Sequence, residues 1–250
     1  MIYVNGCSYT FGIGTMPHDT PDACLSNAWP AHLSELLNKE IINEALPGSC
    51  NTRIFRDTII QLSKETPELV IVMWSDAART EIFKHNEGDW YREIFDLYQV
   101  TPQGVSGIKD YFHREALESY YSFIHTDAKS IIDTLTMMLA VKELCAARGI
   151  PYIAHVYKSN LERKIRHTIL NLESSKDATV VNTLNKLISL VAELEGKYIY
   201  GVNSDMSFDK LCVDNHLPYS EYSMGHPGRE GHIMMADWFK EVIEENDLVS

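Results

Sequence analysis

The 250-residue sequence lacks the features that mark membrane and disulfide-rich secreted proteins. No run approaches the roughly 20 consecutive apolar residues that a membrane-spanning helix needs. The N-terminus has neither a basic segment nor a long apolar segment, so no signal peptide is expected. The five cysteines are odd in number and include no C-x-x-C pair, which argues against a disulfide framework. We therefore expect a cytoplasmic protein that does not contact a membrane.

Positive charge is also scarce. The chain has 22 Lys and Arg against 35 Asp and Glu, a formal net charge of −13. Because phosphate contacts need clustered Lys and Arg, nucleic acid is not an expected partner. The remaining composition, 45% hydrophobic and 23% charged, is that of a globular protein that can bury a sizeable core without disulfides.

Short apolar runs alternate with segments of helical periodicity, and this alternation predicts parallel βαβ units. We expect one domain over residues 1–250, a flavodoxin-like three-layer α/β/α sandwich with a parallel sheet of about five strands. Loops are expected at 14–27 and 203–229. Strands are expected at 2–4, 41–45, 69–73, 152–156 and 198–200, and helices from Trp29, from Asn51, from a cap at Asp127, twice within 161–195, and after Arg229.

An aromatic-rich segment interrupts this pattern around residues 83–126. Aromatic side chains stack well on sugars and other rings, so the segment could form a substrate wall or lid. The simpler interpretation is a mostly helical insertion that packs its aromatic side chains inward. We expect the helical insertion.

A small-residue turn carrying a hydroxyl follows the first expected strand directly. Gly6-Cys7-Ser8 places Ser8 at the carboxyl end of that strand, where open α/β sheets bind ligands. Glycine there lets the backbone turn sharply and approach a substrate. A lone Gly-x-Ser is also typical of a loop serine that caps the next segment, so the motif needs support from elsewhere in the chain.

Two distant motifs supply that support. Gly48-Ser49-Cys50-Asn51 follows the second expected strand, and His226-Pro227 with Gly231 precedes the last expected helix. In this order, and together with Gly6 to Gly12, they resemble the conserved blocks of the SGNH, or GDSL, hydrolases. The resemblance covers nearly the whole chain and implies a strand order of 2-1-3-4-5.

The resemblance also implies site residues. Ser8 would be the nucleophile and His226 its general base, because a serine hydroxyl needs a base within hydrogen-bond reach. The backbone N–H groups of Ser8 and Gly48 would donate to the oxyanion, with Asn51 or Ser75 as a third donor.

Two positions depart from the family pattern. Ser75 stands where the family has the asparagine of a Gly-x-Asn-Asp block, and Ser223 stands where it has the acid of Asp-x-x-His. Asp214 or Glu221 could replace that acid, or a backbone carbonyl could orient a Ser–His dyad. Without a carboxylate partner, His226 would titrate near or below the reference pKa of about 6.5.

These observations predict an esterase without a cofactor, acting on an ester of a small molecule or a carbohydrate. The alternative is a catalytically silent SGNH-like binding or structural module, which the two departures favour. A metal site is a weaker alternative, because its ligand-type residues have irregular spacing. We instead expect His232 to pin the last helix by a hydrogen bond. The candidate metal ligands are Asp214, His216, His226 and His232.

Overall fold

The computed structural model describes residues 1–17, 20–83, 97–100, 111–124, 126–157, 160–173, 176–194, 198–200, 202, 207–217, 219–221 and 225–249. Its elements in chain order are β1 (Ile2–Asn5), α1 (Ser8–Phe11), α2 (Pro21–Asn27), α3 (Trp29–Leu37), β2 (Ile41–Asn43), α4 (Asn51–Lys64), β3 (Leu69–Trp74), β4 (Thr80–Phe83), β5 (Leu97–Val100), α5 (Tyr111–Ser119), a π-helical turn (Tyr120–Ile124), α6 (Asp127–Ala147), β6 (Tyr152–Val156), α7 (Asn160–Glu173), α8 (Ala178–Leu194), α9 (Phe208–Asp214) and α10 (Arg229–Glu244).

A parallel sheet forms the centre of the molecule, in the order β2-β1-β3-β6. The predicted fold class and the predicted order of these four strands are confirmed. The fifth strand, expected at 198–200, is reduced to a single parallel bridge between Ala154 and Ile199. Tyr198 has a φ of 76°, and a residue in the left-handed region cannot continue an extended strand.

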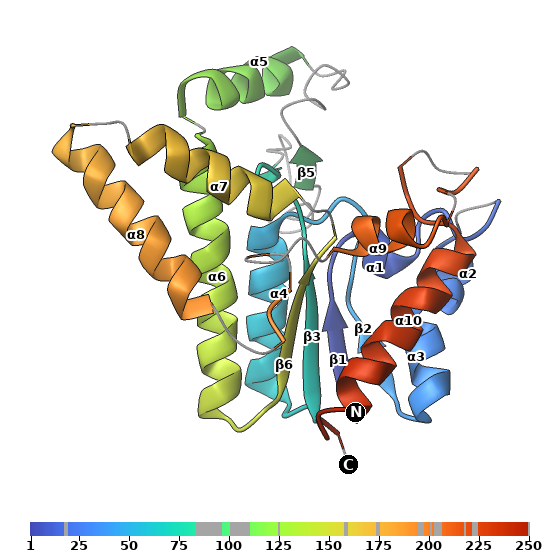
Figure 1. Cartoon of the computed structure of the whole chain (residues 1–250). Coiled ribbons are helices and arrows are strands. Elements are labelled where there is room, and N and C mark those ends of the chain that lie inside the picture. Colours follow the sequence, from blue (N-terminus) through green and yellow to red (C-terminus); the bar gives the residue numbers. More distant parts are fainter. Residues whose placement is uncertain are drawn as a thin grey trace.

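Helices cover both faces of this sheet, which makes three layers (Figure 1). Side chains alternate along β1, so that Tyr3 faces α4 and α6 while Ile2 and Val4 face α3 and α10. All of β1 and β3 is buried, as expected of central parallel strands. In Figure 1, α7 and α8 form an outer pair beside α6.

Two helices lie in segments where the sequence predicted loops, so those parts of the prediction are wrong. In α2, Pro21 occupies the first turn, where its fixed φ suits a helix. In α9, the Ser207 hydroxyl accepts from the Lys210 N–H, and Phe208 is fully buried. The cap of α6 is likewise Thr126 rather than the predicted Asp127. The predicted helices from Trp29 and Asn51 and the split pair after residue 160 are confirmed.

The segment around 83–126 contains α5 and the π-helical turn, and also β5, which pairs antiparallel with β4. Residues 84–96, 101–110 and 125 of that segment lie outside the described residues. Within the described ranges, none of the helices combines the length and the apolar character that crossing a membrane would require.

Candidate active site

The position of Ser8 follows directly from the end of β1. Cys7 is the N-cap of α1 and Ser8 is its first residue, 5% exposed. The amide of Asn5 fixes this turn from below: its oxygen accepts from the Gly6 N–H at 2.7 Å and its nitrogen donates to the Thr58 hydroxyl at 3.2 Å. The strand, the turn and α4 are thereby joined beneath the serine.

Gly6 is required by close approach rather than by an unusual φ. A Cβ at this position would lie 2.2 Å from the Thr10 hydroxyl oxygen and 3.1 Å from the Met73 carbonyl oxygen. Any side chain would therefore push α1 away from β3. The predicted need for glycine before Ser8 has this physical basis.

His226 reaches Ser8 from the other end of the chain. Its Nε2 atom lies 2.9 Å from the Ser8 Oγ, a hydrogen-bond distance between residues 218 positions apart. The ring of Tyr9 packs beside the imidazole, with centroids 5.1 Å apart. The Tyr9 hydroxyl donates to the carbonyl oxygen of Gly225, so the residue after Ser8 holds the residue before His226. Burial is the largest cause that raises the pKa of Tyr9, which keeps this hydroxyl protonated as a donor.

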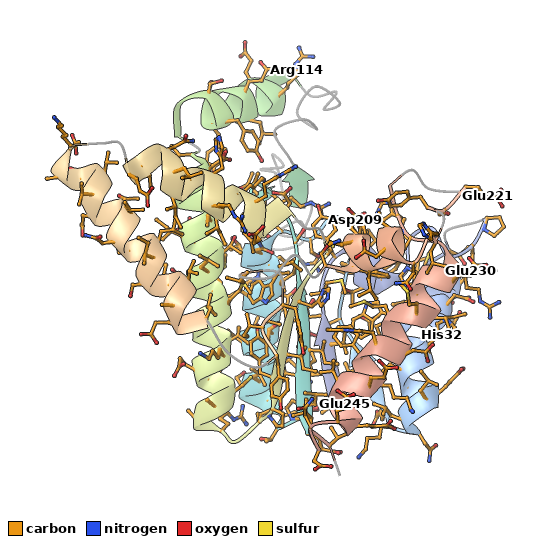
Figure 2. The ribbon with its side chains drawn as sticks, in the orientation of Figure 1. His32, Arg114, Asp209, Glu221, Glu230 and Glu245 are labelled. Carbon is orange, nitrogen blue, oxygen red and sulfur yellow. The ribbon has the colours of Figure 1, made fainter. Side chains whose placement is uncertain are left out.

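The loop that carries His226 is held on its outer side as well. The Ser220 N–H donates to the His226 carbonyl oxygen at 2.8 Å, and Tyr219 forms an antiparallel bridge with Pro227. The Tyr219 hydroxyl donates to Asp209 Oδ1 at 2.5 Å, which ties this loop to α9. Figure 2 shows Asp209 at the end of α9 that faces the carboxyl ends of the strands.

Gly14 lies against the same loop. A Cβ at Gly14 would lie 2.9 Å from the Ser220 Cβ, 3.1 Å from the His226 Cβ and 3.2 Å from the Pro227 carbonyl oxygen. Its φ of 92° is also in the left-handed region. The segment after α1 therefore packs on the histidine loop at the van der Waals limit, which glycine alone allows.

Two backbone donors have no acceptor in the described part of the chain. Ser8 begins α1 and so lacks an intrahelical acceptor for its N–H. Gly48, with a φ of 78°, lies in the turn that precedes α4. These are the two N–H groups that the sequence predicts for the oxyanion, and their role remains a prediction.

The amide of Asn51 has different partners from those predicted. Its nitrogen donates to the Ser75 carbonyl oxygen and to the Thr134 hydroxyl, both at 3.1 Å, and its oxygen accepts from the Ser75 N–H at 2.7 Å. Both amide hydrogens are therefore used, one on the loop after β3 and the other on Thr134 of α6. Ser75 itself is 3% exposed, and its Oγ has no hydrogen-bond partner among the described residues.

Neither predicted substitute acid contacts His226. Asp214 ends α9 and accepts from Lys210 Nζ with both carboxylate oxygens at 2.9 Å. Glu221 is exposed and points outward at the edge of the molecule (Figure 2). Ser223, the position that replaces the family acid, lies outside the described residues, and so the expectation for the pKa of His226 stays a prediction.

The candidate metal ligands do not converge. His232 is fully buried on α10, and its Nδ1 accepts from the Trp29 N–H at 3.1 Å, which confirms that it pins the last helix. Burial is the largest cause that lowers the pKa of His232 to about 3, so it is neutral. Among the described residues, no group of three or more His, Cys, Asp or Glu side chains is placed to hold a metal ion.

Arg79, Tyr9 and Tyr157 also lie at this site and were not predicted from the sequence. Arg79 follows β3 and lies over the Tyr157 ring, 5.4 Å from its centroid. Tyr157 follows β6, and its ring meets the Tyr9 ring edge-on at 4.6 Å. The available signal was positional, because each of these residues comes just after a strand, at the edge of the sheet that carries Ser8.

Two pockets lie in the described part of the chain, and neither is lined by Ser8 or His226. One, of about 370 Å³, is lined in part by Phe11, Leu25 and Leu46. The other, of about 140 Å³, is more polar and is lined in part by Thr52 and Arg79. Phe11 shares α1 with Ser8, so the larger pocket begins on the helix that carries the serine.

Solved structures share this fold. A protein assigned to the lipolytic G-D-S-L family, from Desulfitobacterium hafniense DCB-2, has a TM-score of 0.51 at 13% identity, over 96% of this chain and 98% of that one. The crystal structure of TesA gives 0.50 at 10% identity, over 99% of both chains. At such identities the likeness establishes the fold, and the chain therefore has the α/β fold of the GDSL lipolytic proteins.

The sequence assigns the protein to a particular sequence family. Residues 19–164, more than half of the chain, match a family described as "Family of unknown function (DUF6071)", and the protein belongs to that family. No curated protein sequence matches the chain.

Proposed function

We propose that the protein is a serine-dependent ester hydrolase in which Ser8 is the nucleophile and His226 the general base. The observation that carries this proposal is the 2.9 Å contact between Ser8 Oγ and His226 Nε2. Two residues 218 positions apart meet at the edge of the sheet where ligands bind. The G-D-S-L fold is a second, weaker support, because one fold hosts many functions.

The reaction then follows from the geometry. His226 Nε2 accepts the Ser8 hydroxyl proton while Oγ attacks the ester carbonyl carbon, and the carbonyl oxygen becomes an oxyanion. The N–H groups of Ser8 and Gly48 donate to that oxygen. The carbon–oxygen bond to the alcohol then breaks, and the alcohol leaves with the proton from His226. Water repeats the sequence on the acyl-enzyme and releases the acid and the free serine.

The substrate of this proposal is an ester of a small molecule or a carbohydrate. The contacts of His226 with Tyr9 and Ser220 orient the imidazole through its ring and its backbone. The proposed pair is thus a Ser–His dyad or part of an irregular triad.

A second candidate is a catalytically silent module with the same fold. It is favoured by Asp214 and Glu221, neither of which contacts the histidine, and by the amide of Asn51, which is committed to the loop after β3. Hydrolysis of p-nitrophenyl acetate by the wild type and by Ser8→Ala separates the two functions. The esterase predicts turnover that Ser8→Ala lowers by about 10³-fold or more. Equal rates for both proteins would overturn the proposal.

A further inference from the structure

Arg79 lies near the proposed site, but neither the family pattern nor the Ser8–His226 pair gives it a role. It lies four positions beyond Ser75, in the loop after β3, and its Nη1 donates to the Ser49 carbonyl oxygen at 3.4 Å. The Cys7 thiol lies beside the same guanidinium. Cys7 precedes Ser8 and Ser49 follows Gly48. The guanidinium is therefore adjacent to residues that flank both proposed oxyanion donors.

The positive charge of Arg79 is not neutralised by an ion pair. A guanidinium has five N–H donors. The partners of the Arg79 guanidinium near the proposed site are the Ser49 carbonyl oxygen and the Cys7 thiol. Among the described residues, no carboxylate forms an ion pair with it. Burial lowers the pKa of Arg79, but neighbouring groups, Cys7 first, raise it above its ordinary value, so the group stays charged.

Asp76, whose negative charge contributes to raising the pKa of Arg79, already has hydrogen-bond partners. Asp76 Oδ1 accepts from Lys164 Nζ at 2.9 Å and from the Ala78 N–H at 2.9 Å. Lys164 thus neutralises Asp76 from α7 and leaves Arg79 without a fixed counter-ion. A partly buried cation in this state is stabilised by any anion that forms within reach of its donors.

The guanidinium is also held in position before any substrate binds. It lies 5.4 Å from the centroid of Tyr157, a cation–π distance, and Tyr157 is 5% exposed. The Tyr157 ring is fixed in turn by its contact with Tyr9. Donors that are placed in advance stabilise developing charge without having to reorganise.

We propose that Arg79 is the third oxyanion donor of the site, taking the role that related hydrolases give to the asparagine at the position of Ser75. This inference rests on the proposed ester hydrolysis. It answers the question of the third donor, for which the sequence offered Ser75 and Asn51. Ser75 carries no amide, and the amide of Asn51 is occupied by Ser75 and Thr134. A donor from the same loop, four residues further on, replaces both.

The first measurement is the kinetics of Arg79→Met and Arg79→Lys on p-nitrophenyl acetate, with Arg166→Met as the matched control. Arg166 is an exposed arginine of α7 that pairs with Glu162, and its loss changes the net charge equally. Arg79→Met is expected to lower kcat by about 10²–10³-fold with KM nearly unchanged, the pattern of a donor that acts on the oxyanion. Arg166→Met is expected to leave both constants unchanged.

The second measurement asks whether the loss lies in the transition state. Phenylboronic acid adds to a catalytic serine as a tetrahedral anion, so its affinity should fall in Arg79→Met by the same factor as kcat/KM. Added guanidinium chloride should restore part of the rate to Arg79→Ala and none to Ser8→Ala. A purely structural role for Arg79 would show neither the parallel loss nor the rescue.

Two substrates test whether Arg79 stabilises the oxyanion or instead binds a negative charge elsewhere on the substrate. p-Nitrophenyl hydrogen succinate has a carboxylate where p-nitrophenyl isocaproate has an isopropyl group of similar shape. Arg79→Met should lower the enzymatic rate with both esters by the same factor. A loss confined to the succinate, or an effect on KM alone, would overturn the inference while Ser8→Ala still abolishes turnover. An active Ser8→Ala would overturn the proposed function instead, and a wild type that neither turns over esters nor binds phenylboronic acid would overturn both.

Discussion

The loops after β1 and β3 lie at the same edge of one sheet, but they differ in how their polar groups are used. After β1, Ser8 faces His226, and the surrounding contacts hold that pair together. After β3, the backbone of Ser75 is held by Asn51, and Asp76 is paired with Lys164. The first loop brings a serine and a histidine within hydrogen-bond distance, as the proposed ester hydrolysis requires. The second is stabilised as structure and leaves Arg79 as its group directed toward the site.

This difference means that neighbouring loops at one edge of the sheet are held by separate sets of contacts. The loop after β1 is constrained at Gly6 and Gly14, because each allows a contact that no side chain permits. The loop after β3 is constrained through Asn51, which joins it to α4 and α6. Variants that break contacts of the loop after β1 should therefore lower the rate of the proposed reaction. Variants that break the contacts of Asn51 with the loop after β3 should lower the stability of the fold.

The largest expected effect is the loss of the base. His226→Gln should lower kcat/KM for p-nitrophenyl acetate by about 10²–10⁴-fold, because glutamine cannot take up the Ser8 proton. The control is His216→Gln, since His216 is exposed on the loop after α9. Stopped-flow ester hydrolysis measures both variants. A His226→Gln enzyme with wild-type activity would show that His226 is not the base for Ser8, and the proposed function of the loop after β1 would be wrong.

A displaced histidine loop should have the next largest effect. Gly14→Ala would place a Cβ within 3.2 Å of three atoms of that loop, and a misplacement of about 1 Å costs about 10²-fold in rate. Gly149→Ala is a matched control, because Gly149 also has a positive φ, 65°, but no atom within 4 Å of the added Cβ. If the two variants lose activity equally, backbone strain rather than contact with His226 explains the effect.

Tyr9→Phe should have a smaller effect, about 10-fold in kcat. The variant keeps the ring contact with His226 and loses the hydrogen bond to Gly225, which is worth about 1 kcal/mol. Tyr152→Phe removes a buried hydroxyl that accepts from Trp74 Nε1 at 3.0 Å, and it controls for the loss of a buried hydroxyl that has no contact with His226. The pH–rate profile of Tyr9→Phe should also change, since the position of the base changes. An unchanged kcat and profile would remove Tyr9 from the account.

For the loop after β3 the prediction is about stability. Asn51→Ala should lower the free energy of unfolding by about 2–4 kcal/mol, because it leaves the Ser75 backbone and the Thr134 hydroxyl without partners. The activity of the remaining folded protein should fall less than in His226→Gln. Urea unfolding and activity per folded molecule test this together. A stable Asn51→Ala with a rate loss of 10³-fold would return Asn51 to the oxyanion role that the sequence predicts.

The last prediction concerns the stability at acid pH of the sheet beneath both loops, where no effect is expected near neutral pH. Burial lowers the pKa of His155 to about 3, against about 6.5 in the unfolded chain. Between pH 6.5 and 3 the unfolded state therefore binds a proton that the folded state does not, and stability falls as the pH falls, by about 1.4 kcal/mol per pH unit. His155→Phe, in a site lined by Trp238 and Phe239, should remove that slope. Denaturant midpoints between pH 6.5 and 4 with an unchanged slope would contradict this.

The sequence predicted the fold from local patterns, and the resemblance of distant motifs to the SGNH blocks implied that Ser8 and His226 meet. Buried apolar runs identify parallel strands, and Gly-x-Ser directly after the first strand places the hydroxyl at the edge that binds ligands. The helices α2 and α9 were missed because they are short and their burial depends on packing against the rest of the fold. Single residues such as Pro21 and Ser207 are the local signals for them.

The partners of polar side chains were harder to predict. The sequence puts Asn51 and Ser75 near the oxyanion, but it does not show that the amide of one is used by the backbone of the other. It also gives no sign that Arg79 lies beside Cys7 and Ser49, since those residues belong to three separate loops. Such contacts depend on side-chain directions that are set only when the loops pack together.

The most direct test of the central claim is the site of reaction with a fluorophosphonate. The wild type should form one covalent adduct per chain, and mass spectrometry of the digested protein should locate it on Ser8. The adduct should be absent in Ser8→Ala and should form much more slowly in His226→Gln, because the serine is activated by that imidazole. No adduct on the folded wild type, or an adduct at another residue that Ser8→Ala leaves unchanged, would contradict the account.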